Sequence, residues 1–222
     1  MKIDILSIFP EMFTGFLTTS IIKRAIDNNK VEINIHNFRD YSNDPNKKVD
    51  DYSIGGGSGM VLMPQPIFDC VEKIKTDDSF IILMTPQGVK YTELKAKELV
   101  LKKHIIIICG HYEGFDERIR TLADLELSIG DYILTGGELP SMVVTDSIVR
   151  LISGVIKEES YTNESFNNNL LDYPVYTKPI DFRGMKVPDV LLSGHHKNVD
   201  EYRKNEQIKR TRIRRPDLLE KS

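Results

Sequence analysis

The sequence predicts an α/β protein with a parallel sheet that helices cover on both faces. Continuous apolar segments, such as residues 105–109, alternate along the chain with segments of helical periodicity. Strands that are apolar at every position are typical of parallel sheets buried on both sides. The composition agrees: 40% of the 222 residues are apolar and 28% are charged, which excludes collagen, coiled coil and wholesale disorder.

The first two-thirds of the chain supply the expected sheet. Residues 1–9 form an apolar strand, and Pro10 opens a helical pattern that closes at Asn28. Alternation of apolar and polar residues predicts a second strand at residues 31–38, which makes the opening β-α-β. Further strands are expected at residues 80–84, 105–109 and 132–134, and further helices at residues 66–74, 91–101, 116–122 and 141–152.

The last third of the chain has a different character. Residues 158–169 are poor in apolar side chains and include three consecutive asparagines after Phe166, which indicates a linker. Residues 189–192 form a short apolar segment, and the pattern of residues 199–214 predicts a basic helix.

These patterns divide the chain into parts. We expect a domain at residues 1–157, a flexible interdomain linker at residues 158–173, and a small, mainly helical domain at residues 174–222.

Cysteine usage and hydropathy restrict the class of protein. Cys70 and Cys109 form no CxxC pair, so no zinc or disulfide pattern is present and no metal ligands are predicted. The sequence has no signal peptide and no apolar stretch of about 18 residues, so we expect a cytoplasmic protein that does not enter a membrane.

The charge distribution is uneven. The formal net charge is −3, but residues 195–222 carry nine Lys and Arg against five Asp and Glu. Any nucleic-acid interface is therefore expected near the C-terminus.

Residues 39–60 are too long and too polar for a simple connection, and they contain a glycine-rich segment from Gly55 to Gly59. A dinucleotide-binding fingerprint would need an apolar strand before it and a helix on it, whereas acidic residues precede it and Pro64 follows. A mobile loop that contacts substrate and a plain flexible connection both remain open.

Three glycine-bearing loops follow predicted strands, at residues 83–88, 110–114 and 128–140. Each loop alone is most simply a tight turn. The ligand crevice of an open α/β sheet, however, lies beyond the carboxyl ends of its strands. Three such loops together therefore favour one small-molecule pocket, in which glycines permit close backbone approach.

Several long motifs in one order resemble a known family. They are HYEGFDERI, SIGDYILTGGELPSMVVTDSIVR, LLDYPVYTKP and LLSGHH, with FPEMF near the start and IRRPDLL near the end. Together they resemble the bacterial tRNA (guanine-N1)-methyltransferases, which modify the guanine at position 37, 3′ to the anticodon. The resemblance covers nearly the whole chain.

The resemblance implies a fold and a set of ligands that periodicity does not predict. The implied fold is of the SPOUT type, a parallel sheet with a deep C-terminal trefoil knot at residues 1–157, plus the small, mainly helical C-terminal domain. The implied methyl donor is S-adenosylmethionine, bound by the knot loops, and the implied partners are tRNA, held in part by the C-terminal domain, and a second copy of the chain that shares the active site. A requirement for Mg²⁺ is also implied.

The resemblance assigns the cofactor pocket to residues of the three loops. Backbone amides would contact the adenine edge, Glu113 would accept a hydrogen bond from a ribose hydroxyl, and tyrosine and proline faces would enclose the apolar part of the ligand. Ordinary core packing is the alternative role of the apolar members. The implied residues are Leu83, Pro86, Gly110, Tyr112, Glu113, Gly114, Ile129, Gly130, Tyr132, Leu134, Gly136, Gly137 and Pro140.

Methylation of guanine N1 needs a general base, because N1 carries a proton, and a cation to stabilise the charge that develops on O6. The resemblance implies Arg150 as the cation, although a surface ion pair with Asp146 is the alternative. It implies Glu164 as the base, where the family motif has Asp before the Ser-Phe pair. The extra methylene moves the carboxylate, and a misplacement of about 1 Å costs about a hundredfold in rate.

The C-terminal segment matches a partner with phosphates. Seven Lys and Arg between Arg203 and Arg215 are opposed only by Glu206, a pattern that suits tRNA but also a solvated helix face. The chain ends soon after Leu219, where members of the resembled family usually continue into more helix, so the resemblance implies weak tRNA affinity or binding that depends on low salt.

Two other functions stay open from the sequence. One is a different knotted RNA methyltransferase that acts on a ribose 2′-OH or on ribosomal RNA. The other is a protein that binds S-adenosylmethionine and tRNA but has lost catalysis through the change to Glu164.

Overall fold

The computed structural model describes residues 1–157, 161 and 164–220. The chain divides into two compact units, Met1–Ile156 and Lys157–Ser222, and each is described by itself. The expected linker at residues 158–173 lies partly outside the described residues.

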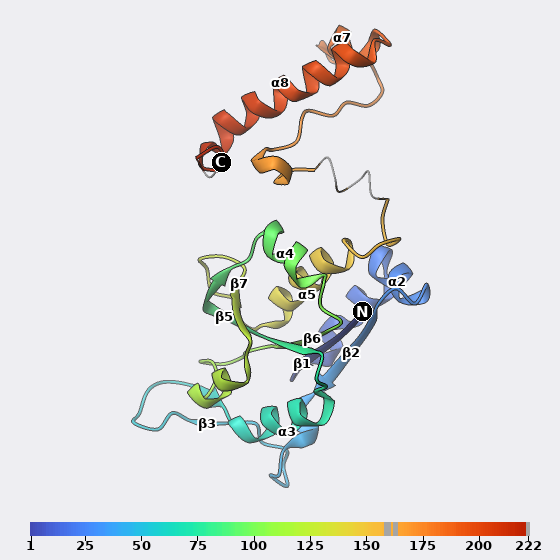
Figure 1. Ribbon diagram of the computed structural model, residues 1–222. Coiled ribbons are helices and arrows are strands. Elements are labelled where there is room, and N and C mark those ends of the chain that lie inside the picture. Colours follow the sequence, from blue (N-terminus) through green and yellow to red (C-terminus); the bar gives the residue numbers. More distant parts are fainter. Residues whose placement is uncertain (158–160, 162–163, 221–222) are drawn as a thin grey trace. The chain divides into compact units, whose positions relative to one another are not determined.

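The first unit is built on a five-stranded sheet in which every pair of neighbouring strands is parallel (Figure 1). The strand order is β2-β1-β6-β5-β7. This confirms the predicted α/β class with a parallel sheet. The strands are β1 (Lys2–Ser7), β2 (Glu32–Asn37), β5 (Ser79–Lys90), β6 (His104–Ile108) and β7 (Leu125–Ser128).

Helices cover both faces of the sheet, as the continuous apolar strands predict. Along β6, Ile105 and Ile107 pack into one core and Ile106 and Ile108 into the other, because successive side chains of a strand point to opposite faces. Figure 1 shows α2, α4 and α5 on one side of the sheet and α3 on the other. The helices of this unit are α1 (Thr14–Thr18), α2 (Ser20–Asp27), α3 (Pro64–Ile74), α4 (Glu93–Leu99) and α5 (Glu138–Val149), with 3-10 turns η1 (Pro10–Phe13), η2 (Phe38–Tyr41) and η3 (Glu117–Leu122).

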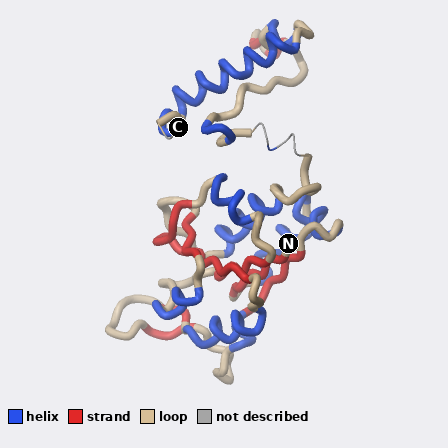
Figure 2. The backbone as a smooth tube through the Cα atoms, viewed as in Figure 1, coloured by secondary structure: helices blue, strands red, loops and turns tan. Residues whose placement is uncertain are grey.

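Three local expectations differ from the structure. The expected first helix is interrupted at Ser20, whose φ of 54° lies in the left-handed region. The polar segment at residues 39–60 contains most of an antiparallel hairpin, β3 (Asp50–Tyr52) and β4 (Met60–Leu62) (Figure 2). Helix α5 begins at Glu138, three residues before the expected start, with Pro140 in its first turn, where proline is tolerated.

The strand expected at residues 132–134 is wrong. The strand is β7, which pairs with β5, and Ser128 ends it by hydrogen bonding the backbone of Gly130 through its hydroxyl. The apolar side chains of Tyr132 and Ile133 lie exposed in the loop that follows.

The second unit is built around the long helix α8 (His196–Arg214), which starts three residues before the expected basic helix. Thr211 is fully buried, and its hydroxyl accepts a hydrogen bond from the Leu171 amide at 2.8 Å. The guanidinium of Arg203 lies 4.9 Å from the ring centre of Tyr173. Residues near 171–173 are therefore held against α8. The other elements are η4 (Asn167–Asn169), β8 (Asp181–Phe182), β9 (Met185–Lys186), α7 (Asp189–Leu192) and η5 (Pro216–Leu218).

A buried carboxylate on β1 has hydrogen-bond partners on both neighbouring strands, β2 and β6. Asp4 on β1 is fully buried and accepts hydrogen bonds from His36 at 3.0 Å, Asn34 at 3.0 Å and His104 at 2.7 Å, with Lys2 at 2.9 Å. Burial alone raises the pKa of the Asp4 carboxyl, but the hydrogen bonds from His36, Lys2, Asn34 and His104 outweigh it and hold the pKa well below its usual value.

We expect Asp4→Asn to lower the free energy of unfolding by about 3 kcal/mol at pH 7. The substitution removes the negative charge to which the partners of Asp4 are hydrogen-bonded. Since the folded-state pKa is lowered, the carboxylate contributes stability above its ordinary pKa of 3.8, and this contribution is lost as the pH falls through the folded-state pKa. The free energies of unfolding of the native chain and of Asp4→Asn, measured in urea, should therefore converge below pH 4. A difference that stays constant as the pH falls would contradict this account.

The control is Asp27→Asn at an exposed position, which should lower the free energy of unfolding by about 0.5 kcal/mol or less.

Candidate active site

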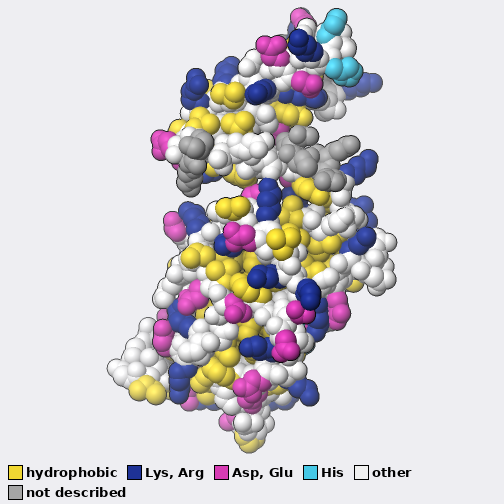
Figure 3. Space-filling view, viewed as in Figure 1, with side chains coloured by type: hydrophobic (Ala, Val, Ile, Leu, Met, Phe, Trp, Pro, Cys, Tyr) yellow, Lys and Arg dark blue, Asp and Glu magenta, His cyan; other side chains and the backbone are white. Residues whose placement is uncertain are grey.

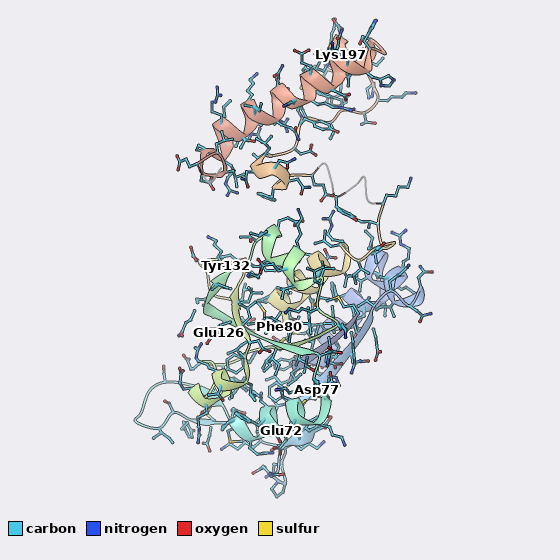
Figure 4. All side chains as sticks on the ribbon, viewed as in Figure 1. Glu72, Asp77, Phe80, Glu126, Tyr132 and Lys197 are labelled. Carbon is cyan, nitrogen blue, oxygen red and sulfur yellow. The ribbon has the colours of Figure 1, made fainter. Side chains whose placement is uncertain are left out.

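A cavity of about 510 Å³ lies at the carboxyl ends of β5, β6 and β7. Because these three strands are neighbours and parallel, the loops after them meet at one edge of the sheet. Figure 4 labels Glu126 on β7 and Tyr132 in the loop that follows this strand, and Tyr132 lines the cavity. The loops after β6 and β7 are joined by backbone contacts. The Gly137 amide donates to the Gly110 carbonyl at 2.7 Å, and His111 forms a β-bridge with Gly136.

Twelve of the thirteen predicted cofactor residues line this cavity. Leu83 does not, because its side chain is fully buried in the core next to α3. The residues that do line it are Pro86, Gly110, Tyr112, Glu113, Gly114, Ile129, Gly130, Tyr132, Leu134, Gly136, Gly137 and Pro140.

Glycines are required where the loops approach one another most closely. A Cβ on Gly137 would lie 2.7 Å from the Cys109 Cα and 2.7 Å from the Gly110 nitrogen. A Cβ on Gly88 would lie 2.3 Å from the backbone nitrogen of Leu127. Both neighbours are backbone, so neither can move aside cheaply.

Gly137→Ala is therefore expected to displace the loop that lines the cavity. Overpacking of this kind costs about 1–3 kcal/mol, and if the loss falls on ligand binding it raises the Kd for S-adenosylmethionine about 5- to 150-fold. Isothermal calorimetry measures the Kd and thermal unfolding measures stability. The control is Gly15→Ala in α1, which meets nothing within 4 Å and should leave binding unchanged and stability equal or higher. Unchanged binding and stability in Gly137→Ala would contradict the proposed close packing.

The loop after β6 is fixed by the β3–β4 hairpin. The Glu113 amide donates to the Met60 carbonyl at 3.0 Å, and the Leu62 amide donates to the Gly114 carbonyl at 2.9 Å. A Cβ on Gly59 would lie 2.5 Å from the Glu113 side chain. The glycine-rich segment of the hairpin thus borders the cavity loop.

Tyr112 has a strained backbone at the cavity. Its φ of 58° is left-handed, which is uncommon for a residue with a bulky side chain. Its hydroxyl accepts a hydrogen bond from Arg39 Nη2 at 3.3 Å, and its ring meets that of His111 edge to face at 4.9 Å between centroids. Strain of this kind is frequent at ligand sites.

Sequence reasoning missed two polar groups at this site. Glu138 is 1% exposed and accepts a hydrogen bond from the Ser7 hydroxyl at 2.6 Å, across 131 positions of sequence. Its other oxygen lies 4.0 Å from His111 Nδ1. Glu138 therefore lies behind His111, which lines the cavity, whereas Arg120 lines the cavity itself. No local pattern marks either residue, because both act through contacts that only the fold creates.

The two candidate catalytic residues belong to different units. Arg150 directly follows α5, is half-buried, and donates its amide to the Asp146 carbonyl at 3.1 Å. Glu164 is half-buried in the second unit, and its carbonyl accepts a hydrogen bond from the Asn167 amide at 3.3 Å. The cavity of the first unit includes neither residue.

The cavity fits S-adenosylmethionine. Its volume falls within the range of small-molecule sites, about 300–1,000 Å³, and it is walled by close-packed glycines, by Tyr112 and Tyr132, and by the acidic Glu113. No group of three or more His, Cys, Asp or Glu suited to a metal ion occurs among the described residues. The residues present therefore give no support to a Mg²⁺ site.

Comparison with known proteins decides the family. A family model described as tRNA (Guanine-1)-methyltransferase TrmD matches residues 1–221. The chain belongs to this family. Proteins called tRNA (guanine-N(1)-)-methyltransferase from Bacillus cereus (strain AH820) and Bacillus anthracis (strain A0248) are each 56% identical over 225 residues. Each alignment covers 99% of this chain and 92% of the relative.

Membership in the TrmD family confirms the resemblance found in the motifs and the prediction of a methyltransferase enzyme. It favours guanine N1 over the ribose and ribosomal RNA alternatives. In the part of the chain that the structure describes, no helix is long and apolar enough to cross a membrane.

Proposed function

We propose that this chain transfers the methyl group of S-adenosylmethionine to N1 of guanine 37 in tRNA. The observation that carries the proposal is the match of the TrmD family model to residues 1–221. The glycine-walled cavity supports it independently, because it can hold a ligand of this size where α/β sheets bind ligands.

The chain's own residues supply the parts of the reaction. S-adenosylmethionine, when bound, provides an electrophilic methyl group on a sulfonium. The loops that contain Gly110, Glu113 and Gly137 hold it and exclude water. Glu164 accepts the proton that guanine N1 loses, and Arg150 stabilises the negative charge that develops on O6 through fixed guanidinium donors.

A homodimer that shares its active site brings the two catalytic residues together in this proposal. Its support is a set of exposed apolar side chains on the first unit. Leu139 and Val143 lie one helical turn apart on α5 and are 50% and 48% exposed, and Ile133 is 78% exposed. Exposed apolar surface of this kind is typical of an interface.

The deep trefoil knot is also part of this proposal. It is supported by family membership and by the contacts of the loop after β6 with residues 136 and 137, which come later in the chain.

We assign tRNA binding to a C-terminal domain at residues 174–222, joined by a linker at residues 158–173, in a cytoplasmic protein. Lys and Arg side chains are spread over the visible face of the second unit (Figure 3). Helix α8 and the residue after it carry Arg203, Lys204, Lys209, Arg210, Arg212, Arg214 and Arg215. Phosphate contacts from such residues make binding weaker as salt increases.

Nucleoside analysis of the product tests the proposal. The chain is incubated with labelled S-adenosylmethionine and an unmodified tRNA transcript, and the RNA is digested to nucleosides. We expect the label in 1-methylguanosine. Label in a ribose-methylated nucleoside would overturn the proposal in favour of another SPOUT activity.

A further inference from the structure

Arg120 joins three segments at the wall of the cavity. It lies in η3 with a side chain only 20% exposed. Its Nε donates to Glu117 Oε2 at 2.9 Å, its Nη1 contacts Glu126 on β7, and its Nη2 donates to Gln87 Oε1 at 2.8 Å. Both Arg120 and Gln87 line the cavity.

The chemistry of arginine fixes how Gln87 is turned. A guanidinium has five N–H donors and no acceptor, so only the carbonyl oxygen of the Gln87 side chain can face it. The amide nitrogen of Gln87, with two donors, then points away from Arg120. Gln87 is thereby set to donate hydrogen bonds.

Gln87 needs such a restraint because of its place in the strand. The pairing of β5 with β7 shifts register between Met84 and Val89, so residues 85–88 bulge from the ladder. Gln87 is exposed in this bulge, and its backbone amide donates a hydrogen bond to the Thr85 hydroxyl at 3.3 Å. An unrestrained glutamine loses rotamer freedom when it binds a ligand, which weakens binding.

The charges around Arg120 argue against direct ligand binding by its own guanidinium. Glu117 and Glu126 both pair with it, so the cluster is negative overall at neutral pH. Such a cluster does not attract an anionic ligand group.

We propose that Arg120 is a positioning residue, which orients the Gln87 amide so that it donates a hydrogen bond to an oxygen of the methyl donor in the cavity. This inference rests on the proposed function, because it takes S-adenosylmethionine as the ligand.

A double-mutant cycle tests the proposal. Calorimetry gives the Kd of S-adenosylmethionine and of S-adenosylhomocysteine, which lacks the sulfonium charge, for the native chain, Arg120→Met, Gln87→Ala and the double variant. We expect each single variant to raise both Kd values about five- to tenfold, the effect of losing one hydrogen bond. The Kd of the double variant should exceed that of either single variant by about twofold at most, because both substitutions remove the same interaction.

A purely electrostatic role and a positioning role of Arg120 predict opposite changes in the Kd of S-adenosylmethionine. Removing the positive charge of Arg120 leaves two carboxylates, which would tighten binding of the sulfonium cation and leave S-adenosylhomocysteine unchanged. Positioning predicts weaker binding of both ligands. The matched control is Arg118→Met, since Arg118 is 70% exposed and pairs with Asp116 away from the cavity, and it should leave both Kd values unchanged.

Arg120→Lys is a milder substitution that tests the proposal if Arg120→Met does not fold. Lysine keeps the charge and the aliphatic stem but lacks the planar fork that reaches Glu126 and Gln87 together, so we expect a smaller rise in both Kd values. A change below twofold in folded Arg120→Met, a rise in Arg120→Lys as large as that in Arg120→Met, or additive effects in the double variant would overturn this inference alone. Absence of binding to the native chain would overturn the proposed function as well.

Discussion

Replacing Glu164 with glutamine is expected to lower kcat for methyl transfer by about 10²–10⁴-fold, the usual contribution of a general base. Glutamine matches glutamate in size but cannot accept the N1 proton. Because Glu164 lies outside the unit that holds the cavity, the Kd for S-adenosylmethionine should stay within about twofold. Single-turnover rates are the decisive measurement, because they report the methyl-transfer step without product release.

The matched control is Glu201→Gln on the exposed surface of α8, which should leave kcat unchanged. Glu164→Asp addresses the departure from the family motif. Aspartate places its carboxylate where the motif has it, so we expect activity equal to or above that of the native chain. If the native chain transfers nothing and Glu164→Asp is active, the chain is a binding protein that has lost catalysis.

Arg150→Ala is expected to lower kcat by about 10²–10³-fold, the loss seen when a donor to a developing oxyanion is removed. The negative charge on O6 then has no fixed cation beside it in the transition state. Arg150→Lys should recover only part of the rate, because a point charge does not reproduce the planar fork. Rapid-quench measurement of a single turnover separates this loss from product release.

Arg24→Ala provides the matched control for Arg150, since Arg24 is exposed at the end of α2 in the same unit. A rate in Arg150→Ala equal to that of Arg24→Ala would assign Arg150 to the surface ion pair that its spacing from Asp146 also allows.

The parts of the fold that the sequence predicts are those that local patterns specify. The apolar run of β6 and the helical pattern of α3 come from periodicity, and both cores then depend on the alternation along β6. The strand β7 was missed because its four residues include Glu126 and show only a short alternation. Its identity as a strand comes from pairing with β5, a long-range contact.

The same limit applies to the site. The glycine-bearing loops indicate a pocket from sequence because parallel strands bring their carboxyl ends to one edge. The partners of Glu138 and Arg120 are not visible, because Ser7 lies 131 positions from Glu138 and Gln87 lies 33 positions from Arg120. The identities of Glu164 and Arg150 as catalytic candidates come from the family motifs alone.

Methyl transfer to a matched pair of tRNA transcripts tests the central claim most directly. One transcript carries guanine at positions 36 and 37, and its twin carries adenine at position 37. We predict label transfer to the guanine transcript only, with reverse transcription stopped at position 37, because a methyl on N1 blocks base pairing. Equal labelling of both transcripts, or label without a stop at position 37, would contradict the account.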